Sequence, residues 1–269
     1  MAKMMWARVI FSFILLQASA LFPADNNDSH TAEFYQQLCG FDSFSPARID
    51  FLKSFITVHP SFLTAYEFLF EAFVQINQLD AADAYFSRLE KAGNPAGASW
   101  MLARLAVFQG DLNKADKLYR LALSSDISNH SPALDYLAFD AKNNNAFHTA
   151  EYLQSLDLPP TDLIFYRACS KYNRGEYQSA DSLFGGLGLT IDDLQRWHYQ
   201  GLADYYQSQL VQADSLFRIG LRRAQEMQDI YHQALFSYNL AYTAKTEPER
   251  VIAQARRLAE SIDAVQLLN

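Results

Sequence analysis

The sequence predicts an all-α solenoid built from antiparallel helix pairs, and three observations support this fold class. A short pattern of small and aromatic residues recurs at intervals of 30 to 35 residues along most of the chain. Only 10 Gly and 8 Pro occur among 269 residues, which argues against disorder and against a β fold with many tight turns. Helix-start signals such as Ser45-Pro46 and Ser131-Pro132 place a capping hydroxyl before a first-turn proline. A period of this length fits stacked helix–turn–helix units.

Each copy of the pattern contains a turn, an aromatic residue or Leu, an alanine and usually an aromatic residue four positions later. The copies at residues 180–184 and 213–217 share the string Ala-Asp-Ser-Leu-Phe. The first five alanines are separated by 33, 35, 30 and 33 residues, and the sixth follows after 40. We therefore assign six alanines as structural anchors of the repeats: Ala82, Ala115, Ala150, Ala180, Ala213 and Ala253. A seventh anchor is proposed at Ala47.

A second small residue lies about twelve positions before most of the anchoring alanines. Ala103, Ala168 and Gly201 are examples, and Trp197 stands four residues before Gly201. Small side chains at both places let the two helices of a pair approach closely, with aromatic rings filling the space to the next pair. The pattern therefore predicts two helices in each repeat.

The second, fourth and fifth copies resemble tetratricopeptide repeats at most of the positions that define that family. Trp197, Gly201, Ala213 and Phe217 carry the resemblance in the fifth copy. The third copy departs, because residues 143–145 are all Asn where the family has a Gly-Asp-like turn. The resemblance implies a right-handed superhelix of antiparallel helix pairs, in which the first helix of each pair lines a concave face.

The first residues read as a secretory signal. Lys3 and Arg8 give a basic start, residues 9–16 are apolar, and residues 18–20 are the small residues of a cleavage site. Cleavage near Ala20 predicts a periplasmic or secreted protein, while retention of the segment as a membrane anchor is the alternative. The predicted organisation is a signal peptide at 1–20, capping helices at 21–62, five repeats at 63–228, and a terminal repeat or cap at 229–269.

The charge and the motifs argue against several classes of function. A formal net charge of −8 disfavours a nucleic-acid partner, which requires a basic surface. Hydrolase, P-loop, zinc-protease and Cys-x-x-Cys motifs are absent, and the six histidines lack the spacing of metal ligands. The sequence therefore predicts no catalysis, no cofactor and no metal. Cys39 and Cys169 are expected to be two buried free thiols, several helices apart.

The resemblance assigns the partner-binding positions to the first helices of the pairs. The notable feature is their aromatic character, which is typical of interaction hot spots, although such rings also pack between neighbouring helices. Some members of the family bind a C-terminal carboxylate with a cluster of Lys and Asn residues. The candidate set here has only one arginine and one lysine, so a hydrophobic or aromatic peptide is the expected ligand. The candidates are Trp100, Arg104, Phe108, Phe139, Lys142, Phe165, Cys169, Tyr172, His198, Leu202, Tyr205, Tyr206, Tyr238 and Tyr242.

These observations predict an exported scaffold or adaptor that binds a protein or peptide in its concave groove. An envelope complex is the expected partner, with at most peripheral association with a membrane. The alternative function is capture of a periplasmic ligand, either a glycan or a peptide, on the aromatic groove.

Overall fold

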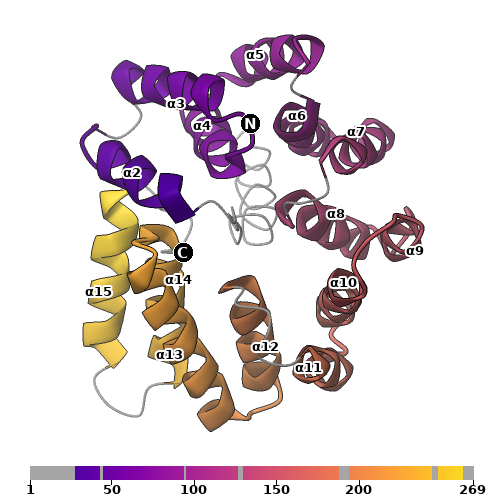
Figure 1. Ribbon diagram of the computed structural model, residues 1–269, viewed down its shortest axis with the longest axis vertical. Helices are drawn as coiled ribbons and strands as arrows, with labels where there is room; N and C mark the ends of the chain where they lie inside the picture. Colours follow the sequence, from indigo (N-terminus) through magenta and orange to yellow (C-terminus); the bar gives the residue numbers. More distant parts are fainter. Residues whose placement is uncertain are drawn as a thin grey trace, which may run out of the picture. The chain divides into compact units, whose positions relative to one another are not determined.

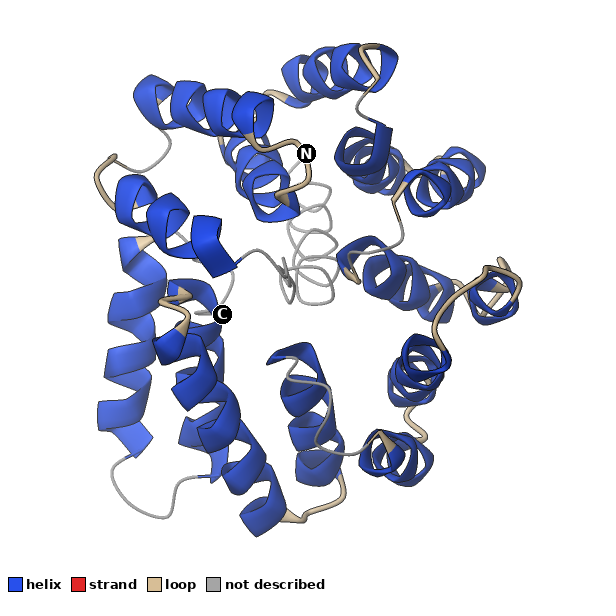
Figure 2. Cartoon of the chain, viewed as in Figure 1, coloured by secondary structure: helices blue, strands red, loops and turns tan. Residues whose placement is uncertain are grey.

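The computed structural model of the chain describes residues 28–42, 45–93, 95–126, 130–187, 194–243 and 248–262. These residues form fourteen α-helices and no strand (Figure 2). The predicted signal peptide lies outside the described residues, as does the cleavage site near Ala20. Among the described helices, none has an apolar stretch long enough to cross a bilayer.

The helices follow one another along the chain with short connections (Figure 1). Their bounds are α2 Asp28–Leu38, α3 Pro46–Val58, α4 Leu63–Gln75, α5 Leu79–Lys91, α6 Pro95–Gln109, α7 Leu112–Ser125, α8 Ser131–Lys142, α9 Thr149–Gln154, α10 Pro160–Asn173, α11 Tyr177–Gly186, α12 Leu194–Tyr206, α13 Leu210–Glu226, α14 Ile230–Thr243 and α15 Pro248–Ser261.

Consecutive helices pack against each other in pairs. Closely packed pairs include α6 with α7, α10 with α11, α12 with α13 and α14 with α15, and α13 also packs closely against α14. In each of the first three pairs, the second helix carries a predicted anchoring alanine in its first turn. The predicted all-α class is confirmed, and the pairwise packing is consistent with a helical repeat fold.

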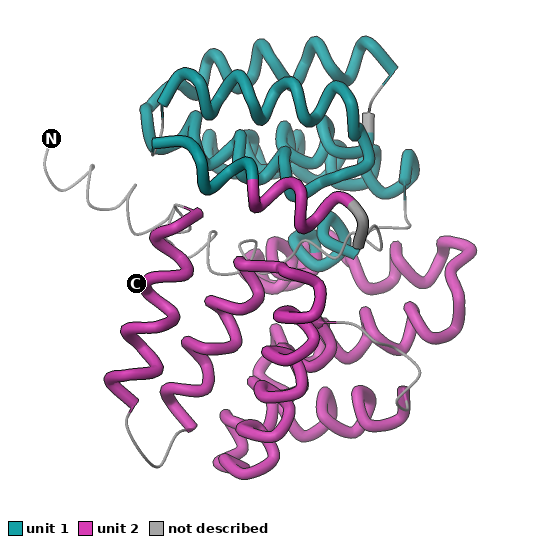
Figure 3. The backbone as a smooth tube through the Cα atoms, turned by 60° about the vertical axis from the view of Figure 1, so that its left-hand side comes forward, with its two compact units in different colours: residues 1–27, 37–136 teal, residues 28–36, 137–269 magenta. Residues whose placement is uncertain are grey.

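The chain divides into two compact units (Figure 3). Unit 1 comprises residues 1–27 and 37–136, and unit 2 comprises residues 28–36 and 137–269. The division falls inside α2 and inside α8.

A left-handed residue stands five positions before each of the first five anchoring alanines. These residues are Asn77, Gly110, Asn145, Gly175 and Ser208, with φ between 56° and 81°. In most of these turns the next amide donates to the carbonyl five residues back, as from Asp111 to Ala106 and from Gln209 to Asp204, both at 2.9 Å. This bond closes the end of the first helix and reverses the chain.

Replacing Ser208 with glycine should stabilise the fold. Ser208 has φ of 62°, a conformation that a side chain disfavours and glycine adopts freely. We expect a gain of about 0.5–1 kcal/mol in the free energy of unfolding, measured by thermal denaturation. The same substitution at Ser215, exposed within α13, should instead cost about 0.5 kcal/mol, because glycine disfavours a helix interior. Equal effects at the two sites would contradict the prediction.

The anchoring alanines differ in burial. Ala82, Ala115, Ala180 and Ala213 have no exposed surface, and Ala150 is half-buried in the short α9. Ala253 and Ala47 are exposed, so the assignment of these two as anchors is wrong. The buried stripe of α15 instead contains Ala255 and Ala259, which lie one helical turn apart. The buried alanine, Ala255, therefore lies two residues after the predicted anchor, Ala253.

Small residues allow close helix approach in unit 2. A Cβ atom added to Gly201 would lie 2.4 Å from the Phe217 ring, and one added to Gly220 would lie 2.2 Å from the Phe236 ring. Phe217 and Phe236 belong to one buried cluster, together with Leu194, Ala213, Ala224 and Leu240. The ring of one helix therefore fills the space left by a glycine of its neighbour.

Both cysteines are free thiols. Cys169 is buried in α10, but Cys39 is exposed, so the expectation that both are buried is wrong for Cys39. Cys39 follows the last residue of α2 and therefore lies outside the buried stripe of that helix.

Candidate functional site

Six of the predicted partner-binding residues, Cys169 among them, lie inside the protein. Trp100, Phe139, Phe165 and His198 are buried, and Arg104 is only 7% exposed. Their assignment to a binding surface is wrong, because side chains of neighbouring helices cover them. Cys169 is likewise buried, whereas Phe108 and Leu202 are half-buried and Lys142 is exposed.

Arg104 belongs to a buried charge network in unit 1. Its guanidinium lies 3.1 Å from Glu71 and 3.4 Å from Glu67, both on α4, and its carbon lies 4.8 Å from the centre of the Phe70 ring. Burial raises the pKa of Glu71 above its usual value, against the opposing charge of Arg104. Arg104 therefore links α6 to α4, and its guanidinium is paired with buried carboxylates of the same unit.

Asp135 connects this network to two further side chains of unit 1. One of its oxygens accepts hydrogen bonds from the Trp100 indole and from the Tyr119 hydroxyl, each at 2.9 Å. The same oxygen lies 3.9 Å from Nε of Arg104. Helices α6, α7 and the first part of α8 thus meet at one buried carboxylate.

His198 pairs with a polar residue inside unit 2. Its Nδ1 lies 3.0 Å from the amide nitrogen of Asn239 on α14. Burial, and in smaller part the nearby His232, lowers the pKa of His198 to about 3. The ring is therefore neutral at ordinary pH, and its contacts are those of a core residue.

The five predicted tyrosines come together in unit 2. They form a continuous group of rings with Tyr177, which we call the tyrosine array. Its members come from α10, α11, α12 and α14: Tyr172, Tyr177, Tyr205, Tyr206, Tyr238 and Tyr242.

Ring contacts run through the tyrosine array without a break. Tyr177 stacks on Tyr206 with centroids 4.8 Å apart, and Tyr172 lies 5.6 Å from Tyr177. Tyr206 meets Tyr205 at 5.5 Å, and Tyr205 meets Tyr242 at 6.2 Å. At the far end, the ring centroids of Tyr242 and Tyr238 lie 5.2 Å apart. Each contact is within the range of favourable aromatic pairs.

The array combines buried support with exposed rings. Tyr206 and Tyr242 are each 54% exposed, and the other four rings are half-buried. The hydroxyls of Tyr238 and Tyr242 lie 2.6 Å apart, and this hydrogen bond raises the pKa of Tyr242 to about 12. Burial raises the pKa of Tyr172 and of Tyr206. These three phenols are therefore neutral at ordinary pH and can donate hydrogen bonds.

Tyr177 is the member that the sequence did not indicate. It stands three residues before the anchoring Ala180, at a position that the repeat pattern assigns to structure rather than binding. The pattern places Tyr206 on α12 but contains no signal that Tyr177, on the second helix of the preceding pair, stacks against it.

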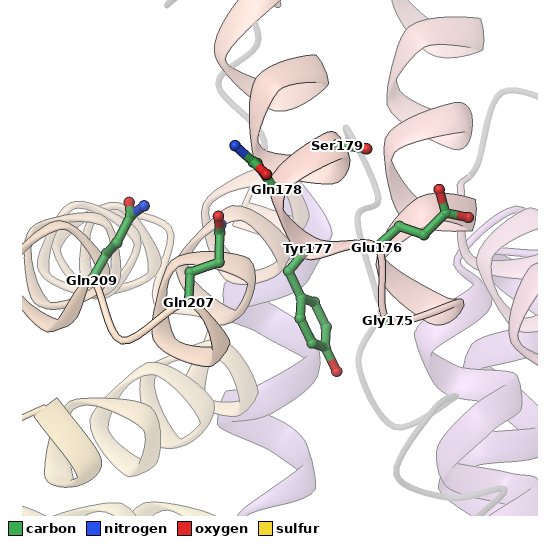
Figure 4. A pocket seen from close by; sticks show the side chains of 7 residues that line it. All are labelled: Gly175, Glu176, Tyr177, Gln178, Ser179, Gln207 and Gln209. Atoms are coloured by element: carbon green, nitrogen blue, oxygen red, sulfur yellow. The ribbon is translucent and has the colours of Figure 1, made fainter.

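A hollow of about 660 Å³ lies at the turn between α10 and α11 and opens widely to solvent (Figure 4). Glu176 is the charged residue of its lining and forms an ion pair with Lys171 at 2.6 Å. The amides of Gln178 and Gln207 extend to the same side of the turn, while Tyr177 points the other way (Figure 4). The lining comprises Gly175, Glu176, Tyr177, Gln178, Ser179, Gln207 and Gln209.

Asp204 on α12 is an acidic residue whose pKa is perturbed, with Asp181 on α11 as one of the causes. Burial, followed by the charge of Asp181 and a hydrogen bond to it, raises the pKa of Asp204 to about 7. Asp204 is only 3% exposed. The Asp204 carboxyl therefore holds its proton to a much higher pH than an ordinary aspartate does.

The substitution Asp204→Asn should change how stability depends on pH. The native pKa is above the unfolded value of 3.8, so the folded state binds the extra proton between about pH 4 and 7. The contribution of Asp204 is therefore fully present below pH 4 and is lost as pH rises through 7. We expect the variant and the parent to agree at pH 4, and the variant to be more stable by about 3 kcal/mol at pH 8. Hydrogen exchange of the α11 and α12 amides would measure this, and a difference independent of pH would contradict it.

Metal binding has no support among the described residues, which contain no group of three or more His, Cys, Asp or Glu placed to hold an ion. The chemistry that the described surface offers is aromatic contact, hydrogen bonding from neutral phenols and the amides of the hollow. Compared with known proteins, the chain matches no protein-family model and no curated protein.

Proposed function

We propose that this protein binds a protein or peptide partner through the tyrosine array of unit 2 and catalyses no reaction itself. The observation that carries the proposal is the unbroken contact of six tyrosine rings, two of which are more than half exposed. Tyrosine contributes a large, rigid contact area with a polar tip, and it is enriched among the residues that dominate binding energy.

The aromatic support explains why the exposed rings suit binding. Tyr206 is held by stacking on Tyr177, and Tyr242 by its contacts with Tyr205 and Tyr238. Rings fixed in this way lose little conformational entropy when a partner covers them. The most exposed part of the array is therefore already ordered for association.

The paired helices and the repeat spacing support a tetratricopeptide-type superhelix, which we propose as the finer description of the fold. The predicted signal at residues 1–20 supports export to the periplasm or beyond. An adaptor in an envelope complex is the role that unites these features. Contact with a membrane would then be peripheral.

The proposal is tested by site-specific photo-crosslinking in the source cells. A photoreactive phenylalanine analogue at position 206 or 242 should form the same adduct with a defined partner. The matched position is Val58, which is 69% exposed but lies on α3 of unit 1. Identical adducts from all three positions would indicate random collision and contradict the proposal.

The variant Tyr206→Ala should weaken binding of the partner identified in this way by about tenfold to a hundredfold. This corresponds to the cost of removing a hot-spot aromatic residue. Val58→Ala should leave the affinity unchanged, and circular dichroism should show that both variants are folded. An affinity unchanged by Tyr206→Ala would count against the array as the binding surface.

Glycan capture is the second candidate, and the amides beside the array favour it. Gln178, Gln207 and Gln209 line the hollow, and their amides can both donate to and accept from sugar hydroxyls. Trp197 is half-buried on α12 of the same unit, so its fluorescence should report ligand binding there. A response to glycans and none to peptides would favour capture over scaffolding.

A further inference from the structure

The tyrosine array presents an uncharged surface. All its members are tyrosines, a residue type without charge at neutral pH. Among the described residues, the cations that lie over aromatic rings belong to unit 1, and none contacts a ring of the array. Lys171 and Glu176, at the α10–α11 turn beside the array, pair with each other at 2.6 Å, and Asp204 is buried. The ligand that complements the array in charge is therefore a neutral one.

Several hydroxyls of the array have hydrogens to donate to a ligand. Those of Tyr238 and Tyr242 share one hydrogen bond at 2.6 Å, so one of their two hydrogens is left over. The hydroxyls of Tyr177 and Tyr205 form no hydrogen bond within the described part of the chain. A fitting ligand therefore supplies acceptors, and the acceptor that every residue of a peptide offers is its backbone carbonyl.

The exposed rings stand at a spacing that suits one peptide conformation. Tyr206 and Tyr242, each 54% exposed, flank Tyr205, whose ring centroid lies 5.5 Å from that of Tyr206 and 6.2 Å from that of Tyr242. Two such steps span at most about 12 Å, and a polyproline II helix returns to the same face after about 9 Å. Two prolines three residues apart can therefore contact both exposed rings.

Of the common modes of peptide recognition, one agrees with these features. Addition of a strand requires a sheet edge, and the described residues contain no strand. A helical peptide bonds its own carbonyls, so it offers few acceptors to the phenols. An acidic or phosphorylated segment requires a cluster of arginines, and the array has none. A proline-rich segment has no charge, leaves its carbonyls unbonded and packs its rings on aromatic side chains.

We propose that the tyrosine array binds a proline-rich segment of the partner in the polyproline II conformation. This rests on the proposed function of the array, for which it names the kind of peptide. Proline rings would pack on Tyr206 and Tyr242, and the hydroxyl of Tyr205 between them would donate to a carbonyl of the segment. Both surfaces are ordered before they meet, because the segment is preformed and the array rings hold one another in place.

The test titrates the full-length protein with fluorescently labelled decaproline, capped at both ends, and follows the anisotropy. A flexible Gly-Ser decapeptide and an alanine-rich helical peptide are the comparison ligands. Decaproline should bind at least about tenfold more tightly than either, because only it is preformed with free carbonyls. Its affinity should not fall as salt is raised, because no charge takes part.

Two variants separate ring contact from hydrogen bonding. Tyr206→Ala removes an exposed ring and should weaken decaproline binding by about tenfold or more. Tyr205→Phe keeps the ring but removes its hydroxyl, so it should weaken binding about twofold to tenfold. The matched control Tyr152→Phe removes a hydroxyl from a half-buried position on α9 of the same unit and should leave the affinity unchanged. Circular dichroism would check that all three variants are folded.

Several results would overturn the inference. Binding of the Gly-Ser or the helical peptide as tight as that of decaproline would show no preference for polyproline II. Absence of decaproline binding at about 1 mM, or equal effects of Tyr205→Phe and Tyr152→Phe, would also refute it. A partner that crosslinks at position 206 and is lost with Tyr206→Ala, yet is not displaced by decaproline, would refute this inference while leaving the proposed function of the array intact.

Discussion

The variant Asp135→Ala should lose about 3–5 kcal/mol of unfolding free energy in unit 1, the largest effect that we expect from a single substitution. The substitution removes the acceptor of the Trp100 indole and of the Tyr119 hydroxyl, both buried. It also removes a carboxylate 3.9 Å from Arg104. Two unsatisfied donors and a less balanced buried charge remain, and each is costly without water.

Urea denaturation followed by circular dichroism, with hydrogen exchange of the α6 and α7 amides, would measure this loss. Asp135→Asn keeps the size of the side chain and one acceptor oxygen, so its cost should be smaller. Lys117→Ala, at an exposed position of α7, should change stability by less than about 0.5 kcal/mol. A loss below about 1 kcal/mol for Asp135→Ala would show that the network contributes little.

The variant Gly220→Ala should destabilise unit 2 by about 1–3 kcal/mol, although alanine is the better helix former. The new methyl group would lie 2.2 Å from the ring of Phe236, which has no exposed surface. The ring must shift by more than 1 Å to restore ordinary contact, within a cluster that is already filled. The cost of overpacking therefore exceeds the gain of about 1 kcal/mol in helix propensity.

Gly185→Ala is the matched control, because Gly185 also lies in a helix but nothing stands within 4 Å of its added Cβ. We expect this control to gain up to about 1 kcal/mol, measured by thermal denaturation. The double variant Gly220→Ala/Phe236→Leu replaces the ring with a smaller side chain. Its loss of unfolding free energy should be less than the sum of the losses of the two single variants. A gain for Gly220→Ala alone would show that the ring moves aside freely.

Much of the local structure follows from the sequence because it depends on neighbours along the chain. The turn before each second helix needs a residue that tolerates positive φ, and Gly110 or Gly175 marks it directly. Ser45 caps α3 through the amide of Arg48 at 3.2 Å, as the Ser-Pro pair predicts. The anchoring alanines of the middle repeats fall at equivalent helix positions for the same reason.

The binding surface was less predictable, because exposure depends on helices that are distant in sequence. Trp100 and Tyr206 both stand on the first helix of a repeat, yet only Tyr206 remains exposed. The Trp100 indole donates a hydrogen bond to Asp135, which lies 35 residues later in the chain. A periodic sequence pattern does not predict that contact. The repeat register therefore identified which aromatic residues lie on the first helices, but it did not distinguish the exposed side chains from the buried ones.

By itself, the sequence determined that this protein is a series of helix pairs with alanine anchors, since 3.6-residue periodicity, capping and turn chemistry are local properties. Only the tertiary structure decided which aromatic residues form the tyrosine array and which buried donors surround Asp135. Those features arise where side chains of different helices converge and exclude water. Their burial, and hence their chemistry, is fixed by packing between helices rather than by order along the chain.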